Sequence, residues 1–313
     1  MTDPRPAAVL LMGPTASGKT ALAVELVRRW PLSIISVDSA LVYRGLQIGA
    51  AKPDADTLQA APHRLIDLCA PTQAYSAADF CRDATQAMQE IHAAGRTPLL
   101  VGGTGMYFRA LQQGLSDLPE ADAQVRAELE AEAAVHGWAA LHDRLGRLDP
   151  AAAARIHRND PQRIQRALEV IRITGRPLSE QQGRRRGVLP FRLLKIALCP
   201  QDRALLHERI AERFVLMLRA GLVEEVRALR ALPGIHPELP AMRSVGYRQV
   251  LQQLDGQFAA DELADRGIFA TRQLAKRQIT WLRSEFDAFW RDPGLNGERA
   301  DVARLIGEFC RFD

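Results

Sequence analysis

The amino-acid sequence predicts an α/β protein in which helices flank a parallel sheet and an all-helical domain is inserted into the core. Three observations lead to this prediction. Short apolar segments alternate with helical patterns in residues 7–105, which is typical of parallel strands joined by helices. A glycine-rich motif follows the first apolar segment. Residues 121–175 contain no segment with convincing strand character.

The first part of the chain contains three predicted strands, at residues 7–12, 33–37 and 97–101. The first and third are short apolar runs and the second is rich in β-branched residues, as expected of strands that are buried in a parallel sheet. A helix is predicted between the second and third strands, from Ser76 to about residue 94. Ser76 and Asp79 have the spacing of a capping box, which marks the start of such a helix.

The rest of the chain is predicted to be largely helical. Helical patterns cover residues 122–136 and 138–147, and Asp160-Pro161 starts a further helix that extends to residue 173. Residues 189–198 are predicted to return to the sheet as a strand, before helices at 202–220, 222–231, 243–254 and 260–285. We therefore expect a core of residues 1–116 and 189–313 and a helical insertion domain of residues 117–188.

The composition is that of an ordinary globular protein, with 313 residues of which 47% are apolar and 25% charged. No segment approaches the roughly 20 apolar residues that cross a bilayer, and residues 1–6 do not resemble a signal peptide. The four cysteines lie far apart, which argues against a disulfide scaffold and a cysteine-based zinc finger. We therefore expect a cytoplasmic protein that does not bind membranes.

Positive charge is concentrated in one part of the chain. The formal net charge is only +4, but residues 155–192 contain ten arginines and three acidic residues. Such an excess suits a polyanion such as nucleic acid, although a solvated helical surface has the same composition.

The glycine-rich segment Gly13-Pro14-Thr15-Ala16-Ser17-Gly18-Lys19-Thr20 has the pattern of a P-loop, and the predicted fold is therefore P-loop NTPase-like. The backbone N–H groups of residues 15–20 and the N-terminus of the next helix are expected to face a phosphate. Lys19 adds a positive charge, and the Thr20 hydroxyl can bind Mg²⁺. The motif predicts a site for a diphosphate or longer group without identifying the molecule that carries it.

The second predicted strand ends at Asp38, and ligands of parallel sheets bind at the carboxyl ends of the strands. Asp38 could hold a metal ion or accept a proton from a nucleophile. ATPases and kinases usually have a further metal-binding acid after a neighbouring strand. The third strand instead ends in Gly102-Gly103-Thr104, so this acid is absent there.

Nine short motifs occur in the order that is found in one enzyme family. They are GPTASGKT (13–20), SVDSALVY (36–43), IGAAKP (48–53), PHR (62–64), YSAADF (75–80), VGGTGMY (101–107), NDPQRIQR (159–166), VGYR (245–248) and TRQLAKRQITWLR (271–283). Together they resemble the bacterial tRNA dimethylallyltransferases, also called tRNA isopentenyltransferases or the IPP transferase family. The resemblance extends over nearly the whole chain.

The resemblance implies transfer of a dimethylallyl group from dimethylallyl diphosphate to N6 of adenosine 37 in tRNAs that read codons starting with U. The expected products are N6-(dimethylallyl)adenosine and diphosphate. Mg²⁺ is the expected cofactor and the tRNA anticodon stem-loop the expected RNA partner. We expect a monomer without an obligate protein partner. The P-loop would hold the diphosphate of an isoprenoid rather than ATP, which accounts for the missing strand-end acid.

This reaction gives the candidate residues distinct roles. The P-loop N–H groups, Lys19 and Mg²⁺ on Thr20 are expected to stabilise the departing diphosphate, with Arg213 as an additional contact. Asp38 is expected to accept the proton of the adenine amine. Thr104 resembles a threonine of the family near the same centre, where it could orient the amine or a phosphate oxygen.

The target base lies in a loop and must leave its stack to reach a closed pocket. Tyr247 could stack on a base, whereas Trp281 fits either RNA contact or the protein core. The residues expected to contact tRNA are Asp38, Ser39, Ala40, Leu41, Thr104, Arg126, Gln162, Arg163, Ile164, Gln165, Arg166, Arg243, Ser244, Val245, Gly246, Tyr247, Arg248, Lys276, Arg277, Gln278, Ile279, Thr280, Trp281, Leu282 and Arg283.

Two other functions are compatible with parts of the sequence. A P-loop kinase or NTPase acting on a small substrate would share the phosphate-binding motif. A non-enzymatic RNA-binding protein would share the basic segments, but its function would not depend on Lys19 and Asp38.

Overall fold

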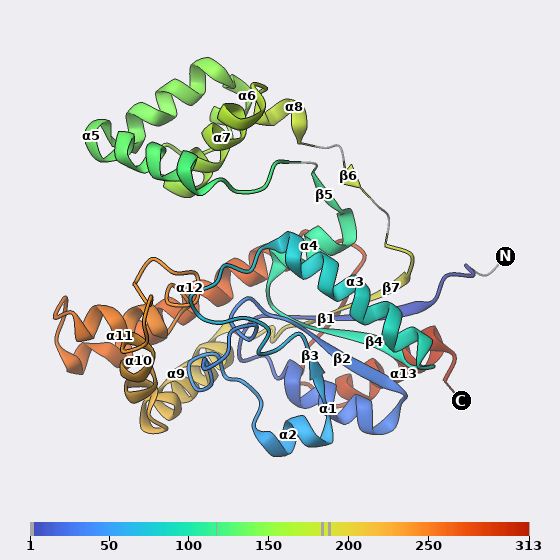
Figure 1. Ribbon diagram of the computed structural model, residues 1–313. Coiled ribbons are helices and arrows are strands. Elements are labelled where there is room, and N and C mark those ends of the chain that lie inside the picture. Colours follow the sequence, from blue (N-terminus) through green and yellow to red (C-terminus); the bar gives the residue numbers. More distant parts are fainter. Residues whose placement is uncertain (1–2, 117, 183–184, 187–188, 313) are drawn as a thin grey trace. The chain divides into compact units, whose positions relative to one another are not determined.

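The computed structural model describes residues 3–116, 118–182, 185–186 and 189–312, and the chain divides into two compact units (Figure 1). The core unit comprises residues 1–111 and 189–313, and the insertion unit comprises residues 112–188. The domain boundaries predicted at residues 117 and 188 lie outside the described residues. No helix among the described residues combines the length and apolar character needed to cross a membrane.

A six-stranded parallel sheet forms the centre of the core unit (Figure 1). Met12 is paired with Gly102 on one side and with Ala197 on the other, so the carboxyl ends of the three central strands are level. The P-loop, Asp38 and Thr104 all follow strand ends at this edge of the sheet. The strand order is β3 (His63–Arg64), β2 (Leu32–Val37), β4 (Thr97–Gly102), β1 (Ala7–Met12), β7 (Arg192–Leu198) and β8 (Phe289–Arg291).

Helices cover both faces of the sheet. One face packs against α3 (Ala77–Ala93), α4 (Gly105–Gln113) and the end of α12 (Leu263–Leu282). The other packs against α1 (Lys19–Arg29) and α13 (Glu298–Cys310). Successive residues of a strand point to opposite faces, so β1 contributes to both cores, which explains its unbroken apolar sequence.

A third hydrophobic core joins the segment after β2 to three helices, α9 (Arg203–Arg219), α10 (Leu222–Arg230) and α11 (Tyr247–Leu254). Tyr43, Phe214 and Tyr247 are buried in this core. It holds α9 and the start of α11 beside the chain that follows Asp38, although these segments are far apart in sequence. The short helix α2 (Ala55–Ala60) and a 3-10 turn at Ala260–Glu262 complete the helices of the core unit.

The insertion unit consists of α5 (Ala123–Leu148), α6 (Pro150–Ala153), α7 (Pro161–Thr174), α8 (Leu178–Gln181) and a small ribbon of β5 (Leu115–Ser116) and β6 (Arg185–Arg186). Its core includes Leu129, Leu145 and Ile164. Helix α5 is interrupted at Gly137, which has a non-helical backbone with φ 77° and ψ 153°. This interruption separates the two helices that the sequence predicts at 122–136 and 138–147.

The predicted fold class is confirmed, with two differences in detail. The insertion is not entirely helical, because the β5–β6 ribbon is antiparallel sheet. No prediction from the sequence covered the edge strands β3 and β8 or the helices α2, α4 and α13. The predicted capping box is present, since Ser76 Oγ accepts the N–H of Asp79 at 3.1 Å.

Candidate active site

A cavity of about 740 Å³ lies at the carboxyl edge of the sheet, which is within the usual size range of small-molecule sites. It brings together many of the predicted site residues, namely residues 15–20 of the P-loop, residues 38–41, Thr104, Arg213, residues 243–245, Arg277 and Gln278. All of its lining residues belong to the core unit. The lining segments are residues 15–21, 38–41, 49–51, 101–104, 209–217 in part, 240–245 in part, and 271–278 in part.

The P-loop is closed on itself around Lys19. Gly18 has a left-handed φ of 83° directly before α1, a conformation that favours glycine. The Nζ atom of Lys19 donates to the carbonyl of Pro14 at 2.6 Å and lies 3.4 Å from Ser17 Oγ. A Cβ atom on Gly13 would lie 2.3 Å from the carbonyl oxygen of Leu198, so the loop can pack on β7 only because this residue is glycine.

The structure corrects the expectation that every backbone N–H of residues 15–20 faces the diphosphate. Thr15 donates its N–H to Gln278 Oε1 at 2.8 Å, and Ser17 donates its N–H to the carbonyl of Pro14 at 3.3 Å. The backbone N–H groups of Thr15 and Ser17 are thus already bonded within the protein. The donors left for a phosphate are therefore concentrated toward the end of the loop, beside Lys19 and the exposed Thr20.

Two cations and one carboxylate interact electrostatically in the cavity. Burial lowers the pKa of Lys19 to about 7, the charge of Asp38 opposes this shift and the charge of Arg213 adds to it. Burial also lowers the pKa of Arg213, against the attraction of Asp38. Among the described residues Arg213 has no hydrogen bond or ion pair with a side chain or carbonyl. The cavity therefore has an excess of positive charge, which suits an anionic ligand.

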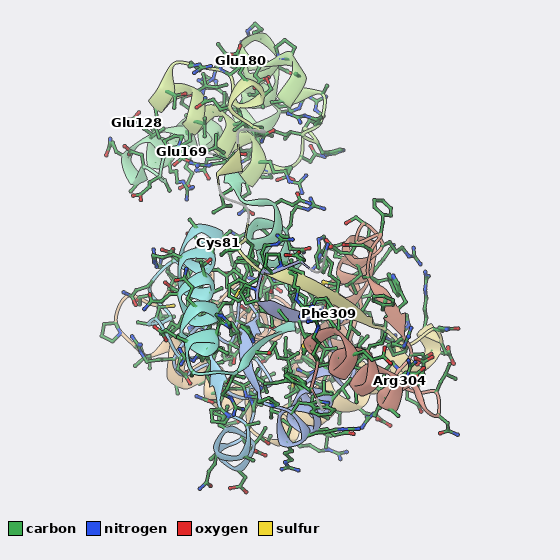
Figure 2. All side chains as sticks on the ribbon, turned by 90° about the vertical axis from the view of Figure 1, so that its right-hand side faces the viewer. Cys81, Glu128, Glu169, Glu180, Arg304 and Phe309 are labelled. Carbon is green, nitrogen blue, oxygen red and sulfur yellow. The ribbon has the colours of Figure 1, made fainter. Side chains whose placement is uncertain are left out.

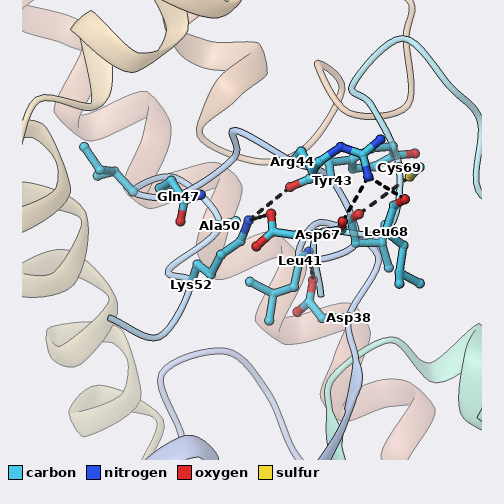
Figure 3. A network of polar contacts seen from close by, with 12 residues as sticks. Asp38, Leu41, Tyr43, Arg44, Gln47, Ala50, Lys52, Asp67, Leu68 and Cys69 are labelled. Carbon is cyan, nitrogen blue, oxygen red and sulfur yellow. Dashed lines mark hydrogen bonds and ion pairs between the residues drawn. The ribbon is translucent and has the colours of Figure 1, made fainter. Parts of the chain in front are cut away.

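Asp38 is held at the end of β2 by the backbone that follows it. Its Oδ1 atom accepts the N–H of Ala40 at 2.8 Å and that of Leu41 at 3.4 Å (Figure 3). Within the described part of the chain, no donor is bonded to Oδ2. One oxygen thus fixes the orientation of the carboxylate while the other is free to accept a proton or bind a ligand.

The chain after Asp38 is anchored by cations on its far side. Arg44 donates to the carbonyls of Asp67 and Leu68, and Lys52 donates to the carbonyl of Tyr43 and to the Asp67 carboxylate (Figure 3). These contacts tie the loop to the segment after β3. Lys52 and Arg44 are therefore structural cations and do not line the cavity.

Thr104 is connected directly to the Asp38 segment. Its Oγ1 atom accepts the N–H of Ser39 at 3.1 Å, and its own N–H donates to the carbonyl of Val37 at 3.3 Å. The glycines around it allow this close approach, because a Cβ on Gly102 would lie 2.0 Å from the Val37 carbonyl oxygen. The VGGTG motif therefore joins the ends of β2 and β4 at the cavity.

The expectation that Tyr247 stacks on a base is wrong for this structure. Its side chain is fully buried, its hydroxyl donates to Glu225 at 2.6 Å, and the same hydroxyl accepts the N–H of Ala50 at 3.2 Å. Burial and the bond to Glu225 raise the pKa of Tyr247. Glu225 also accepts the N–H groups of residues 47–49, so the pair holds the loop whose residues 49–51 line the cavity.

The neighbours of Tyr247 differ in their positions. Arg243, Ser244 and Val245 line the cavity, and the Arg243 side chain is exposed. Gly246 is buried with Tyr247, whereas Arg248 is exposed but does not line the cavity. Only part of this segment is thus available to a ligand.

Helix α12 presents the predicted residues on two faces. Lys276, Arg277, Thr280 and Arg283 are exposed, and among the described residues the three cations have no ion pair. The other face is packed: Leu282 is fully buried and Trp281 stacks on Phe108 with ring centroids 5.7 Å apart. Leu282 is therefore a core residue, a correction to its placement among the RNA contacts, whereas Trp281 is partly buried against the same core. Ile279 packs beside Leu206 and Ile210, and Gln278 reaches the P-loop.

In the insertion unit, the predicted contacts Arg126 and Arg166 are both bonded to Glu169, whose side chain is fully buried (Figure 2). Burial alone would raise the pKa of Glu169, but hydrogen bonds from the two arginines and from the N–H of Asp122 lower it. Ile164 is buried in the unit's core, so its side chain cannot contact RNA and that expectation is wrong.

The remaining predicted residues of the insertion unit are more accessible. Gln162 and Arg163 are exposed, and Arg163 pairs with Asp160 at 3.3 Å. Gln165 donates to Glu130 at 2.9 Å. The first turn of α7 is capped by Asp160, which accepts the N–H of Arg163 at 3.1 Å and the N–H of Ile164 at 3.0 Å.

Several residues that line the cavity were not predicted from the sequence. Motifs signalled those at 49–51, 101–103 and 271–274, whereas no motif marks the residues of α9, Ala21 or Pro240. The residues are Ala21, Gly49, Ala50, Ala51, Val101, Gly102, Gly103, Arg209, Ile210, Glu212, Phe214, Leu216, Met217, Pro240, Thr271 and Leu274.

Comparison with known proteins identifies the family. A profile of the IPP transferase family matches residues 41–285. A tRNA dimethylallyltransferase from Stenotrophomonas maltophilia is 59% identical over 304 residues, which are 95% of this chain and 96% of that protein. One from Alkalilimnicola ehrlichii is 62% identical over 280 residues, which are 90% of this chain and 88% of that protein.

A solved structure agrees with this result. The crystal structure of the tRNA isopentenylpyrophosphate transferase from Bacillus halodurans is similar to this chain, with a TM-score of 0.71 and 36% sequence identity. The similarity covers 98% of this chain and 97% of that chain. The family indicated by the nine motifs is thereby confirmed, and the chain belongs to the IPP transferase family.

Proposed function

We propose that the chain transfers the dimethylallyl group of dimethylallyl diphosphate to N6 of adenosine 37 in tRNAs that read codons starting with U. The observation that carries this proposal is the composition of one cavity. Lys19 and Arg213 suit a diphosphate, and Asp38, on the same cavity, suits an amine that must lose a proton. The curated relatives described above are tRNA dimethylallyltransferases, which agrees with this chemistry.

On the donor side, the bond between C1 of the allyl group and the diphosphate oxygen breaks, and its electron pair leaves with the diphosphate. Lys19, Arg213 and the N–H groups late in the P-loop stabilise this negative charge. Arg213 has no protein anion to displace among the described residues. Its guanidinium is therefore available to the leaving group without the loss of an existing ion pair.

The residues present fit a magnesium ion. The Thr20 hydroxyl lines the cavity and offers an oxygen ligand of the kind that Mg²⁺ prefers. The described residues contain no group of three His, Cys, Asp or Glu side chains able to hold a metal, which fits an ion that takes its other ligands from diphosphate and water. When bound, this ion would neutralise charge on the diphosphate.

On the acceptor side, the N6 amine forms the new bond to C1 and loses one proton. Asp38 accepts that proton at Oδ2, because Oδ1 is already bonded to the backbone of residues 40 and 41. Thr104 keeps the Asp38 segment in place through Ser39. The adenine lone pair is delocalised into the ring, so proton removal and positive charge at C1 are both needed for transfer.

The RNA surface that we propose is smaller than the one predicted from the sequence. It includes the exposed cations Arg243, Arg248, Lys276, Arg277 and Arg283 of the core unit. Residues 38–41 and Thr104 meet the extruded base in the cavity. Extrusion costs roughly a few kcal/mol, which contacts to phosphates and to the flipped base must offset.

The proposal is tested by incubating the protein with dimethylallyl diphosphate, Mg²⁺ and an anticodon stem-loop that contains A36-A37-A38. We expect the nucleoside at position 37 to gain the mass of one dimethylallyl group in place of a proton, with release of diphosphate. A stem-loop with guanosine at position 37 is the matched control and should remain unmodified. An unmodified A37 together with steady ATP hydrolysis would instead support a P-loop kinase or NTPase.

We also propose that the enzyme works as a monomer in the cytoplasm. The four cysteines are free thiols, as expected in a reducing compartment. Light scattering across a range of protein concentrations should give the mass of a single chain, and a stable dimer would contradict the proposal.

A further inference from the structure

The side-chain amide of Gln278 connects two loops of the cavity. Its Oε1 atom accepts the N–H of Thr15 in the P-loop at 2.8 Å, and its Nε2 atom donates to the carbonyl of Gly103 at 3.1 Å. The two partners fix the orientation of the amide, because an N–H requires the oxygen and a carbonyl requires the nitrogen. Gln278 therefore makes a defined bridge between the end of β1 and the end of β4.

The glycines after β4 allow this bridge. A Cβ atom on Gly103 would lie 2.3 Å from Gln278 Nε2 and 3.0 Å from the carbonyl oxygen of Gly13. A Cβ on Gly105 would lie 2.3 Å from the Trp281 ring. Gln278 and Trp281 are three residues apart and lie on the same face of α12. Helix α12 is thus seated on the VGGTG turn at two points, and each point requires a glycine.

The bridge continues to the acceptor side of the cavity. Gly103 is followed by Thr104, whose hydroxyl accepts the N–H of Ser39. Ser39 directly follows Asp38. A short series of hydrogen bonds therefore runs from the P-loop, which binds the donor, through Gln278 and Thr104 to the segment that carries the proposed base. Lys276 and Arg277, the residues before Gln278, are exposed.

We propose that Gln278 is a positioning residue that sets the placement of the P-loop relative to Thr104 and Asp38, rather than a contact to RNA. Transfer requires C1 of the donor and N6 of the acceptor to meet in line, and a displacement of about 1 Å can reduce the rate about 100-fold. The amide fixes Thr15 of the P-loop and Gly103, the residue before Thr104. The inference rests on the proposed function, because it assigns the donor to the P-loop and the base to Asp38.

The test compares Gln278→Met, which keeps the length of the side chain and removes both hydrogen bonds, with the matched control Gln273→Met on the same helix. Gln273 is half-buried and does not line the cavity. For Gln278→Met we expect kcat to fall roughly 10- to 100-fold and the KM for dimethylallyl diphosphate to rise by about 10-fold. The Kd for the anticodon stem-loop should change less than about 2-fold, with the same salt slope.

A second readout requires neither RNA nor turnover. In Gln278→Met the N–H of Thr15 loses its acceptor, so its hydrogen exchange should become faster, whereas Gln273→Met should leave it unchanged. Gln278→Glu retains an acceptor for Thr15 but cannot donate to Gly103. It should therefore keep the Thr15 N–H protected while kcat still falls, which separates the bridge from simple loss of folding.

Two results would overturn the inference. Unchanged kcat and donor KM in Gln278→Met would show that the bridge is not needed. A weakened RNA affinity with unchanged donor kinetics would make Gln278 an RNA contact. In both cases wild-type protein still modifies A37, whereas failure of the wild type to do so would refute the proposed function itself.

Discussion

The two units of the protein use positive charge in opposite ways. In the insertion unit Arg126 and Arg166 are bonded to the buried carboxylate of Glu169. In the core cavity Lys19 donates to the carbonyl of Pro14, and the described residues pair neither Lys19 nor Arg213 with a carboxylate. An arginine-rich composition therefore does not by itself locate a polyanion site. Cations without a protein partner are better candidates, and among the described residues the cavity is lined by several, including Arg213, Arg243 and Arg277.

The largest expected effect on activity is that of replacing Asp38, the carboxylate of the cavity to which we assign the role of base. Asp38→Asn should reduce kcat by about 10²- to 10⁴-fold, because the amide cannot accept the proton of the amine. The affinity for the anticodon stem-loop should be nearly unchanged in a filter-binding measurement. Asp56→Asn, on the exposed surface of α2, is the control and should behave as wild type. Equal losses of RNA binding and turnover in Asp38→Asn would mean that Asp38 is structural.

The paired arginines should affect stability rather than activity. Arg126→Ala leaves the buried Glu169 with one charged partner fewer, which should destabilise the insertion unit by about 1–3 kcal/mol. Arg163→Ala is the matched control, since that side chain is 71% exposed and its ion pair should contribute less than about 1 kcal/mol. Hydrogen exchange of the α7 backbone amides measures the loss of stability in each variant. Equal protection in the two variants would contradict the contrast between the units.

The pH dependence of diphosphate binding sharpens the description of the cavity. The pKa of Lys19 is about 7 in the free protein, and an anionic ligand favours the protonated amine, so the pKa is higher in the complex. Binding therefore takes up a proton above pH 7, and affinity should fall by up to about 10-fold per pH unit until the pKa of the complex is reached. Below pH 7 Lys19 is protonated in the free protein and in the complex, so it does not make the affinity depend on pH.

Calorimetry with inorganic diphosphate and Mg²⁺ measures this dependence. Lys19→Arg is the control, because its guanidinium stays protonated throughout the range and the ligand's own titration is identical for both proteins. The difference between the two proteins isolates Lys19. Identical pH profiles would show that Lys19 does not titrate near neutral pH.

The smallest effects are expected for single exposed cations on α12. Lys276→Ala should weaken binding of the stem-loop several-fold and lower the salt slope by about one unit, because one phosphate contact is lost. Arg266→Ala, on the same helix, removes a cation that is already paired with Glu262 and should leave the slope unchanged. A similar change in the salt dependence of binding in both variants would mean that an ion pair within the protein does not keep a cation from binding RNA.

Much of the fold was accessible from the sequence because apolar periodicity and caps determine individual elements. Ser76 with Asp79 and Asp160 with Pro161 mark the helix starts where the structure has them. The strand β8 was missed because it has three residues, two of them exposed, and therefore lacks the apolar run of a central strand. Its place depends on pairing with β7, a contact that local sequence does not contain.

The candidate site was predictable where backbone geometry requires particular residues, and less so where tertiary packing decides. The P-loop and the VGGTG turn depend on glycines that the motifs display directly. A motif marks a continuous segment, whereas a helix presents only one face to a ligand. Ile164, Tyr247 and Leu282 are consequently buried within segments that also carry exposed cations. Arg213 was identified, but its freedom from a partner is visible only in three dimensions.

The most direct test of this account is a crystal structure of the protein with an anticodon stem-loop and a thiolodiphosphate analogue of the donor. We predict that the diphosphate lies on the P-loop beside Lys19 and Arg213, and that N6 of A37 lies within hydrogen-bond distance of Asp38 Oδ2. A carboxylate that points away from the amine, or a base held outside the 740 Å³ cavity, would contradict the account.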